Sequence, residues 1–232
     1  MHPSAMNNGK IFFERYLQYM PAGVKPKVVD IGAQDVNGSL RSVCLSNVEY
    51  IGVDFIVGKG IDVVLEDPYT LPFEDATIDV VVSSSCFEHS EMFWLLFLEV
   101  VRVLKPHGVF YLNAPSNGSF HRYPVDCWRF YPDSAMALVT WAKRNQYPVC
   151  LLESFTAFQM NDVWNDYVAV FLKDESFALS YPEKMFTGRD DVENITVFKQ
   201  EVLLKQTPLT EDLRQLRDLK HKIQLVNNVS IS

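Results

Sequence analysis

Short apolar runs alternate with helical segments along most of the chain, and this alternation constrains the fold more than any other feature. Strands are expected at residues 27–32, 50–54, 78–83, 109–113, 149–158 and 167–172. Helices are expected at residues 7–20, from about Ser39, and at 91–104 and 133–145. Strands that alternate with helices form an α/β fold with a doubly wound, mostly parallel sheet. Such a sheet binds its ligands at the carboxyl ends of its strands.

The alternation stops near Lys173, which divides the chain into two expected parts. We expect residues 1–173 to form the α/β domain and residues 174–232 to form a C-terminal extension. Within the extension, apolar side chains recur on one face of a helix at about residues 209–226. This helix either docks on the domain or contacts a partner, for which a homodimer is one possibility.

Composition limits the partners and the compartment. The net charge of −8 argues against a nucleic-acid partner, because phosphate binding needs concentrated Lys and Arg. The longest apolar stretch, residues 92–98, is too short to span a membrane. Four scattered cysteines indicate free thiols in a reducing compartment. We therefore expect a soluble, cytoplasmic protein that does not bind nucleic acid.

Three carboxylates stand where strands of the expected sheet end. Asp30 precedes Gly32 by two residues, Asp54 ends the second strand, and Asp67 precedes the third. The spacing of Asp30 and Asp54 is typical of an acid that binds ribose hydroxyls. The pattern GxGxxG is absent, which argues against a nicotinamide-dependent dehydrogenase. A carboxylate at Asp30 also suits a cationic ligand better than a pyrophosphate.

Five segments of the chain resemble the motifs of class I S-adenosylmethionine-dependent methyltransferases, most closely the small-molecule, type 11 domain. They are, in order, VVDIGAQ, YIGVD, EDPYTLPFED, IDVVVSSSCFEH and EVVRVLKPHGVFYLNAPS. The resemblance covers residues 27–116 and implies a Rossmann-like, seven-stranded fold with S-adenosylmethionine as cofactor. The HRYPVDCWRFYPDS stretch also resembles methyltransferases of polysaccharide and nucleotide-sugar pathways.

The resemblance implies a set of cofactor-binding residues. By this resemblance, Asp30, Gly32 and Gln34 line the methionine end. Asp54 binds the ribose and Phe55 packs on the adenine. Asp67 and Pro68 lie beside the adenine amino group, whereas Ser84 and Ser85 pass under the sulfonium. Gln34 replaces a usual glycine, so its side chain either restricts the pocket or binds the methionine carboxylate. Only residues 55–61 separate Asp54 from Asp62, too few for the second crossover helix.

The loop after residues 109–113 is rich in aromatic and ionisable side chains, and the resemblance places the acceptor there. His121, His89 and Asp126 are candidate bases. Arg122, Tyr123, Trp128 and Arg129 are candidate acceptor-binding residues. Structural roles compete for each of these residues. Trp128 can belong to the core, Arg129 can pair with Asp126 or Asp133, and His89 can bond to backbone. His121 and Asp126 alone do not make a metal site, so no metal is expected.

Three functions are compatible with these residues. The first is O-methylation of a sugar, a glycan precursor or a phosphorylated small molecule. The second is N-methylation of an amino sugar or another amine. The third is a non-catalytic cofactor-binding or scaffolding subunit, which the unusual Gln34 and the shortened crossover would explain.

Overall fold

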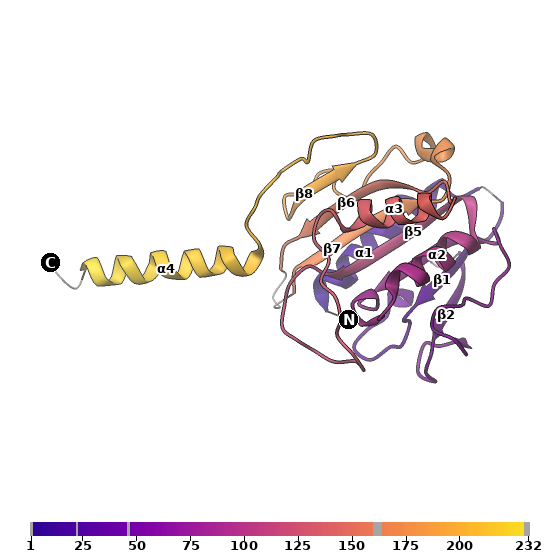
Figure 1. The fold of residues 1–232 in the computed structure, drawn as a ribbon, viewed down its shortest axis with the longest axis horizontal. Coiled ribbons are helices and arrows are strands. Elements are labelled where there is room, and N and C mark those ends of the chain that lie inside the picture. The colour runs from indigo at the N-terminus through magenta and orange to yellow at the C-terminus, as the bar shows by residue number, and fades with distance from the viewer. Residues whose placement is uncertain (1, 22, 46, 160–163, 230–232) are drawn as a thin grey trace.

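Eight strands form a single sheet in the computed structural model, which describes residues 2–21, 23–45, 47–159 and 164–229 (Figure 1). Their order across the sheet is β3-β2-β1-β4-β5-β7-β6-β8. The strands are β1 (Lys27–Ile31), β2 (Glu49–Asp54), β3 (Val63–Val64), β4 (Ile78–Ser84), β5 (Leu104–Pro115), β6 (Cys150–Ala157), β7 (Asp166–Leu172) and β8 (Val192–Val197).

The sheet is parallel from β3 to β5 and antiparallel beyond it. β1 pairs in parallel with β2 and β4, β2 with β3, and β4 with β5. β7 runs antiparallel to β5 and β6, and β8 runs antiparallel to β6. The predicted α/β, Rossmann-like fold is therefore confirmed. It has eight strands rather than seven, because β8 forms in a stretch where the sequence has no clear periodicity.

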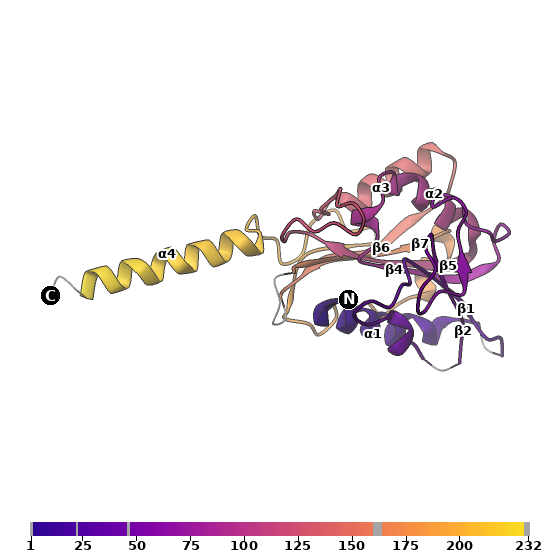
Figure 2. The ribbon, with the colours of Figure 1, turned by 90° about the horizontal axis from the view of Figure 1, so that it is seen from below.

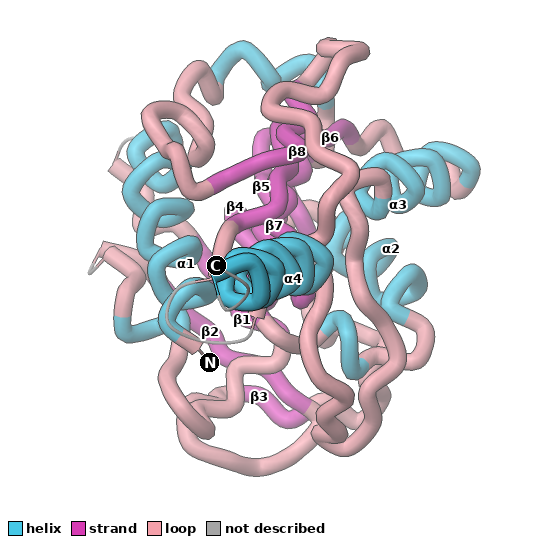
Figure 3. Tube along the Cα trace, turned by 90° about the vertical axis from the view of Figure 1, so that its left-hand side faces the viewer, coloured by secondary structure: helices cyan, strands magenta, loops and turns pink. Residues whose placement is uncertain are grey.

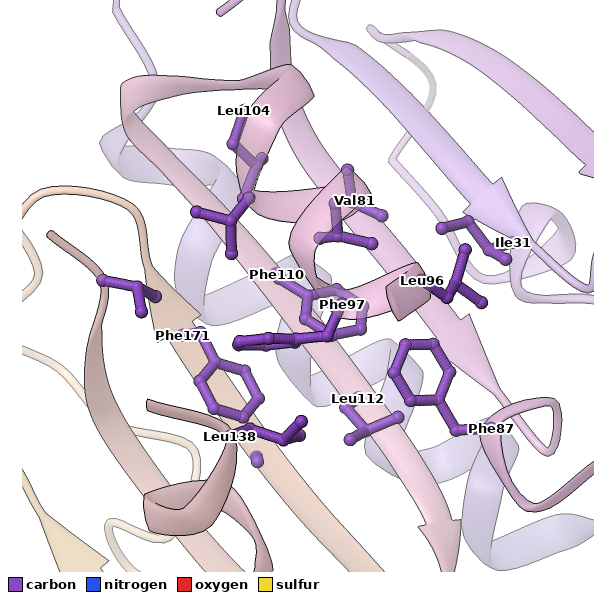
Figure 4. Close-up of a cluster of buried hydrophobic side chains, with 14 of the residues drawn as sticks. Ile31, Val81, Phe87, Leu96, Phe97, Leu104, Phe110, Leu112, Leu138 and Phe171 are labelled. Carbon is purple, nitrogen blue, oxygen red and sulfur yellow. The ribbon is translucent and has the colours of Figure 1, made fainter. Parts of the chain in front are cut away.

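Three helices cover the two faces of the sheet (Figure 2). α2 (Phe93–Val103) and α3 (Ser134–Arg144) lie on one face, and α1 (Pro3–Tyr16) lies on the other. Under α2, Phe97 packs against Phe171 with ring centroids 4.9 Å apart, and Phe110 stacks beside them (Figure 4). Both faces of the central strands are thus buried, as a parallel sheet requires.

Two connections near β2 hold no α-helix in the described residues. The helix expected from Ser39 is wrong: the chain forms only a 3₁₀ turn, Leu40–Ser42. The Ser39 hydroxyl accepts from the Arg41 backbone N–H, and the turn ends at β-branched Val43. The missing second crossover helix is confirmed, because residues 55–62 form a loop that leads to the two-residue strand β3.

The C-terminal helix α4 (Glu211–Val229) extends away from the body of the molecule (Figures 1 and 2) and is seen nearly end-on in Figure 3. Its base is attached by Arg214, which pairs with Glu193 at 2.6 Å and lies over the Phe158 ring. Farther along, Leu219 and Ile223 are about half exposed, so this apolar face does not dock on the sheet. No helix in the described part of the chain is long and apolar enough to span a membrane.

Candidate active site

The turn after β1 lies against the segment after β4. The backbone N–H groups of Gly32 and Ala33 both donate to the Val53 carbonyl, at 3.0 and 3.2 Å. Gly32 has φ +77°, and a Cβ at this position would lie 2.6 Å from the Cβ and Sγ of Cys86. A side chain at Gly32 would therefore be strained and would also clash. The strand ends that line a cofactor site in this fold are in contact here.

Asp30 is a buried carboxyl group on β1. It accepts a hydrogen bond of 2.7 Å from the Tyr50 hydroxyl, and its side chain is almost fully buried. Burial raises the pKa of Asp30 to about 7, against the opposing effect of the Tyr50 hydrogen bond. A cationic group bound beside Asp30 would favour its ionised form.

Gln34 lies between the glycine turn and the loop after β5. A Cβ at Gly58 would lie 2.9 Å from the Gln34 Nε2, so the side chain packs directly on that glycine. The Gln34 Oε1 accepts a hydrogen bond of 3.1 Å from the Tyr123 hydroxyl. The structure thus gives Gln34 a partner that the sequence did not suggest. This contact joins the turn after β1 to the loop between β5 and α3, residues 116–133, named the acceptor loop because the resemblance places the acceptor there.

Asp54 ends β2, and Phe55 follows it directly. The Asp54 carboxylate is buried and accepts from the Phe55 N–H at 2.7 Å. Burial raises the pKa of Asp54, and backbone hydrogen bonds from Phe55, Ile56 and Gln34 oppose this effect. The Phe55 side chain is 49% exposed and offers a free face to a planar ring.

Asp67 has a local structural role in addition to any contact with a ligand. Its carboxylate accepts from the Tyr69 N–H at 3.0 Å and from the Thr70 hydroxyl at 2.8 Å, which lowers the pKa of Asp67. Asp67 and Pro68 are both exposed in the turn that follows β3. The carboxylate therefore caps a turn, a role that sequence alone could not separate from ligand binding.

The end of β4 carries buried hydroxyl groups that lack partners. The Oγ atoms of Ser84 and Ser85 are buried and have no hydrogen-bond partner within the described residues. Ser85 also has a positive φ of +53°. A buried hydroxyl without a partner destabilises a fold by roughly 1–3 kcal/mol. These hydroxyl groups could find partners in a bound ligand. Together with the carboxyl groups of Asp30 and Asp54, they suit S-adenosylmethionine better than a purely structural turn would require.

His89 and Glu88 follow β4 and are tied to the acceptor loop. The Nδ1 of His89 lies 2.5 Å from the Val125 carbonyl, which can only accept, so Nδ1 carries the proton. Burial lowers the pKa of His89, which favours a neutral ring whose Nε2 is an acceptor. This Nε2 lies 3.6 Å from Oε1 of Glu88. Burial raises the pKa of Glu88 to about 8.

His121 completes this cluster from the acceptor loop. Its ring meets the His89 ring edge-on, with centroids 4.8 Å apart, and its Nδ1 lies 3.4 Å from Oδ2 of Asp126. Asp126 accepts two hydrogen bonds from Arg129, at 2.6 and 2.9 Å, and one from the His121 N–H. Arg129 lowers the pKa of Asp126 to about 2, so this carboxylate orients His121 and is a poor base near neutral pH.

The other candidate acceptor-binding residues differ in how far their side chains are already bound by other protein groups. Arg122 is exposed and has no hydrogen bond or ion pair within the residues the structure describes. Trp128 is 37% exposed, donates to the Ser90 carbonyl and meets Phe93 edge-on. Arg129 is committed to Asp126. Arg122 is therefore the arginine of this loop that can bind an anionic acceptor.

A buried polar network beneath the acceptor loop escaped the sequence analysis. Asp166 is fully buried and accepts from the Ser4 hydroxyl at 2.5 Å and from Asn113 Nδ2 at 3.0 Å. His2 approaches the same carboxylate at 3.5 Å and stacks on Trp164. The N-terminal helix and β7 meet here although they are far apart in the chain, and no local pattern signals such a contact.

Comparisons with known proteins place this geometry in a class. Residues 29–112 match a family model described as a methyltransferase domain. Among curated proteins, none matches the sequence. The chain thus carries a methyltransferase domain of the S-adenosylmethionine-dependent class, whose cofactor is S-adenosylmethionine.

Solved structures with this fold are similar at low identity. One is the Burkholderia thailandensis 1,6-didemethyltoxoflavin-N1-methyltransferase with bound 1,6-didemethyltoxoflavin and S-adenosylhomocysteine. It is 16% identical in sequence, the match covers 74% of this chain and 79% of that chain, and the TM-score is 0.56. Another is an S-adenosylmethionine-dependent methyltransferase from Archaeoglobus fulgidus: 17% identity, 72% and 94% coverage, TM-score 0.50. The [4+2]-cyclase SpnF also shares it: 11% identity, 74% and 82% coverage, TM-score 0.50. The fold alone therefore does not fix the reaction.

Proposed function

We propose that the protein transfers the methyl group of S-adenosylmethionine to a hydroxyl group of a sugar, a glycan precursor or a phosphorylated small molecule. The observation that carries this proposal is the cluster of Glu88, His89 and His121, at the carboxyl end of β4 and under the acceptor loop. The acceptor oxygen attacks the methyl carbon, the carbon–sulfur bond breaks, and S-adenosylhomocysteine leaves. The hydroxyl proton must also leave, and the cluster is the place that can remove it.

The cofactor is held by the first half of the sheet. In this proposal Asp30 binds the methionine ammonium, Asp54 binds the ribose hydroxyls, and Phe55 packs on the adenine. The resemblance adds Gly32, Gln34, Asp67, Pro68, Ser84 and Ser85 to this set. The buried, unpartnered hydroxyls of Ser84 and Ser85 and the raised pKa of Asp30 support it. When bound, the cofactor supplies an electrophilic methyl group, so the protein mainly positions the acceptor.

The acceptor is held by the loop after β5. Arg122 suits a phosphate or carboxylate group because it is exposed and uncommitted. Tyr123 and Trp128 suit a sugar or nucleobase ring, since both side chains are partly exposed beside the cluster. Asp126 and Arg129 keep His121 in place. A polysaccharide or nucleotide-sugar pathway would supply acceptors of this kind.

An amine acceptor is the second candidate, and one observation favours it. The buried Oε2 of Glu88 has no partner within the described residues, and Asp166 adds negative charge nearby. A cationic amino sugar would be attracted to these carboxyl groups. N-methylation still requires a neutral amine at the moment of attack, but no separate base must contact the acceptor atom.

The test is methyl transfer from labelled S-adenosylmethionine to nucleotide sugars, sugar phosphates and amino sugars. We expect His89→Gln and His121→Ala to lower kcat for a hydroxyl acceptor by about 10²–10⁴-fold near neutral pH. His221→Ala on the exposed helix α4 is the control and should change nothing. Transfer to an amine that survives His121→Ala would favour the second candidate. Transfer to none of these acceptors would contradict both.

Two further properties belong to this proposal. Cys44, Cys86, Cys127 and Cys150 are all free thiols, which supports a reducing, cytoplasmic location. We also propose that α4 packs on α4 of a second copy. Leu216, Leu219, Ile223 and Val226 follow the alternating three- and four-residue spacing of a two-stranded coiled coil.

A further inference from the structure

We propose that Glu88, His89 and His121 bind a divalent transition-metal ion with the ligand preference of zinc. No metal is expected from the sequence, because His121 and Asp126 alone do not make a site and Glu88 lies in a different segment. The binding itself is independent of the proposed function. Only the role of the ion, which is to hold the acceptor oxygen, rests on that function.

The ligand atoms already lie close together. One ligand atom from each of the three residues lies within 4.8 Å of the other two. Oε1 of Glu88 and Nε2 of His89 are 3.6 Å apart. Two ligands at about 2.0–2.1 Å from a tetrahedral zinc ion are roughly 3.3 Å apart. The Glu88–His89 pair is thus close to coordination geometry, whereas the His121 ligand atom lies up to 4.8 Å away and would have to move closer.

Both histidines have the supporting contacts that metal ligands usually have. A metal-binding histidine donates its other ring N–H to a carbonyl or carboxylate oxygen, which fixes its orientation. His89 makes this contact through Nδ1 with the Val125 carbonyl. The Nδ1 of His121 faces Asp126 at 3.4 Å, and Arg129 holds Asp126 in turn. The Nε2 of His89 is thus left to bind an ion, and the His121 ring would supply the third ligand atom.

An unpartnered buried oxygen points to a ligand at this site. Glu88 is 1% exposed, and its Oε2 has no hydrogen-bond partner within the described residues. Removing a carboxylate oxygen from water without a partner is costly, and a coordinated cation would offset this cost. Two histidines and one carboxylate also form the ligand set of several catalytic zinc sites, which keep a further position open.

An ion at this position would change how the acceptor loses its proton. A hydroxyl group bound to a divalent ion is more acidic than a free one. Its proton passes to water, the oxygen attacks the methyl carbon, and the carbon–sulfur bond breaks as S-adenosylhomocysteine leaves. No electron is exchanged. His89 and His121 then act by holding the ion, and they do not take the proton themselves.

Direct metal binding tests the proposal. The metal-free, full-length protein is titrated calorimetrically with Zn²⁺, and with Co²⁺ followed by visible absorption. We expect one equivalent to bind at micromolar or lower concentration, with Co²⁺ bands typical of a nitrogen and oxygen site. His89→Ala, His121→Ala and Glu88→Gln should each weaken binding at least 10-fold. Asp126→Asn, which alters the support of His121, should weaken it by about 10–100-fold.

Controls separate this site from adventitious binding. His221→Ala on α4 and Cys127→Ser, an exposed thiol, should leave the affinity unchanged. Circular dichroism and S-adenosylhomocysteine affinity show that each variant is folded. No binding by the wild type, or equal loss in a control variant, overturns the metal site. Methyl transfer that persists in chelator overturns the role of the ion but not the proposed function. Metal binding without methyl transfer to any acceptor would support the metal site and contradict the proposed function.

Discussion

The cofactor side and the acceptor side of the proposed site are built in different ways. On the cofactor side, backbone contacts between adjacent strands do most of the positioning, as in the bonds from Gly32 and Ala33 to Val53. On the acceptor side, side chains from distant segments hold one another, as Ser4 and Asp166 do. Backbone groups in fixed positions can bind a cofactor that many enzymes share, whereas an individual acceptor needs its own set of side chains.

The largest expected effect is on the cofactor side, at Gly32. Gly32→Ala places a Cβ 2.6 Å from Cys86 in a left-handed backbone conformation, so we expect at least a 100-fold loss of S-adenosylhomocysteine affinity. Gly188→Ala is a matched control, because Gly188 has almost the same φ, +76°, and nothing within 4 Å of its Cβ position. Calorimetry and denaturant unfolding compare the two variants.

Both alanine variants should lose about 1–2 kcal/mol of unfolding free energy from the left-handed backbone alone. The difference between them then reports the contact with Cys86. Equal cofactor affinity in the two variants would show that the Gly32–Cys86 contact does not shape the cofactor site.

On the acceptor side, Asp126→Asn should lower activity about 10–100-fold while cofactor affinity changes less than twofold. The substitution weakens the bidentate contact with Arg129 that holds His121. Asp126 has a depressed pKa of about 2, so its contribution to stability is present above about pH 4 and is lost as the pH falls toward 2. Acid unfolding followed by tryptophan fluorescence should be less steep in this range for the variant. Parallel losses of activity and cofactor affinity would contradict the separation of the two sides.

Asp30 tests the cofactor side through pH. Its pKa is raised to about 7, so the folded state binds a proton more tightly than the unfolded chain does. Stability should therefore fall as the pH rises from about 4 to about 7, and Asp30→Asn should remove part of this dependence. The variant should also bind S-adenosylmethionine about 10-fold more weakly. Urea unfolding at several pH values measures the first effect. If Asp30→Asn leaves the pH dependence of the unfolding free energy unchanged, the raised pKa of Asp30 is contradicted.

The smallest effect on stability is expected on α4, which belongs to neither side. Leu219 and Ile223 are exposed, so Leu219→Glu should change the unfolding free energy by less than about 0.5 kcal/mol. The same substitution should abolish a dimer formed through this face, which light scattering after size exclusion measures. A wild-type protein that is a monomer at high concentration would contradict the proposed dimer.

Sequence reasoning succeeded for features that depend on a local pattern of residues. The strands that end at Asp54 and Ser84 and the absent second crossover helix follow from apolar runs and spacing. It failed at Ser39, where a capping residue was followed by a 3₁₀ turn instead of a helix, and at β8, which pairs with β6 without an apolar period of its own. It could not find Asp166, because burial by the N-terminal helix is a tertiary effect.

Calorimetric titration with S-adenosylhomocysteine tests the central claim most directly. The wild-type protein should bind at micromolar concentration, and Asp54→Asn should bind at least 10-fold more weakly, because the ribose loses a charged acceptor. Asp190→Asn, at a fully exposed carboxylate, is the control and should bind like the wild type. A folded wild-type protein that does not bind S-adenosylhomocysteine would contradict the account of the site.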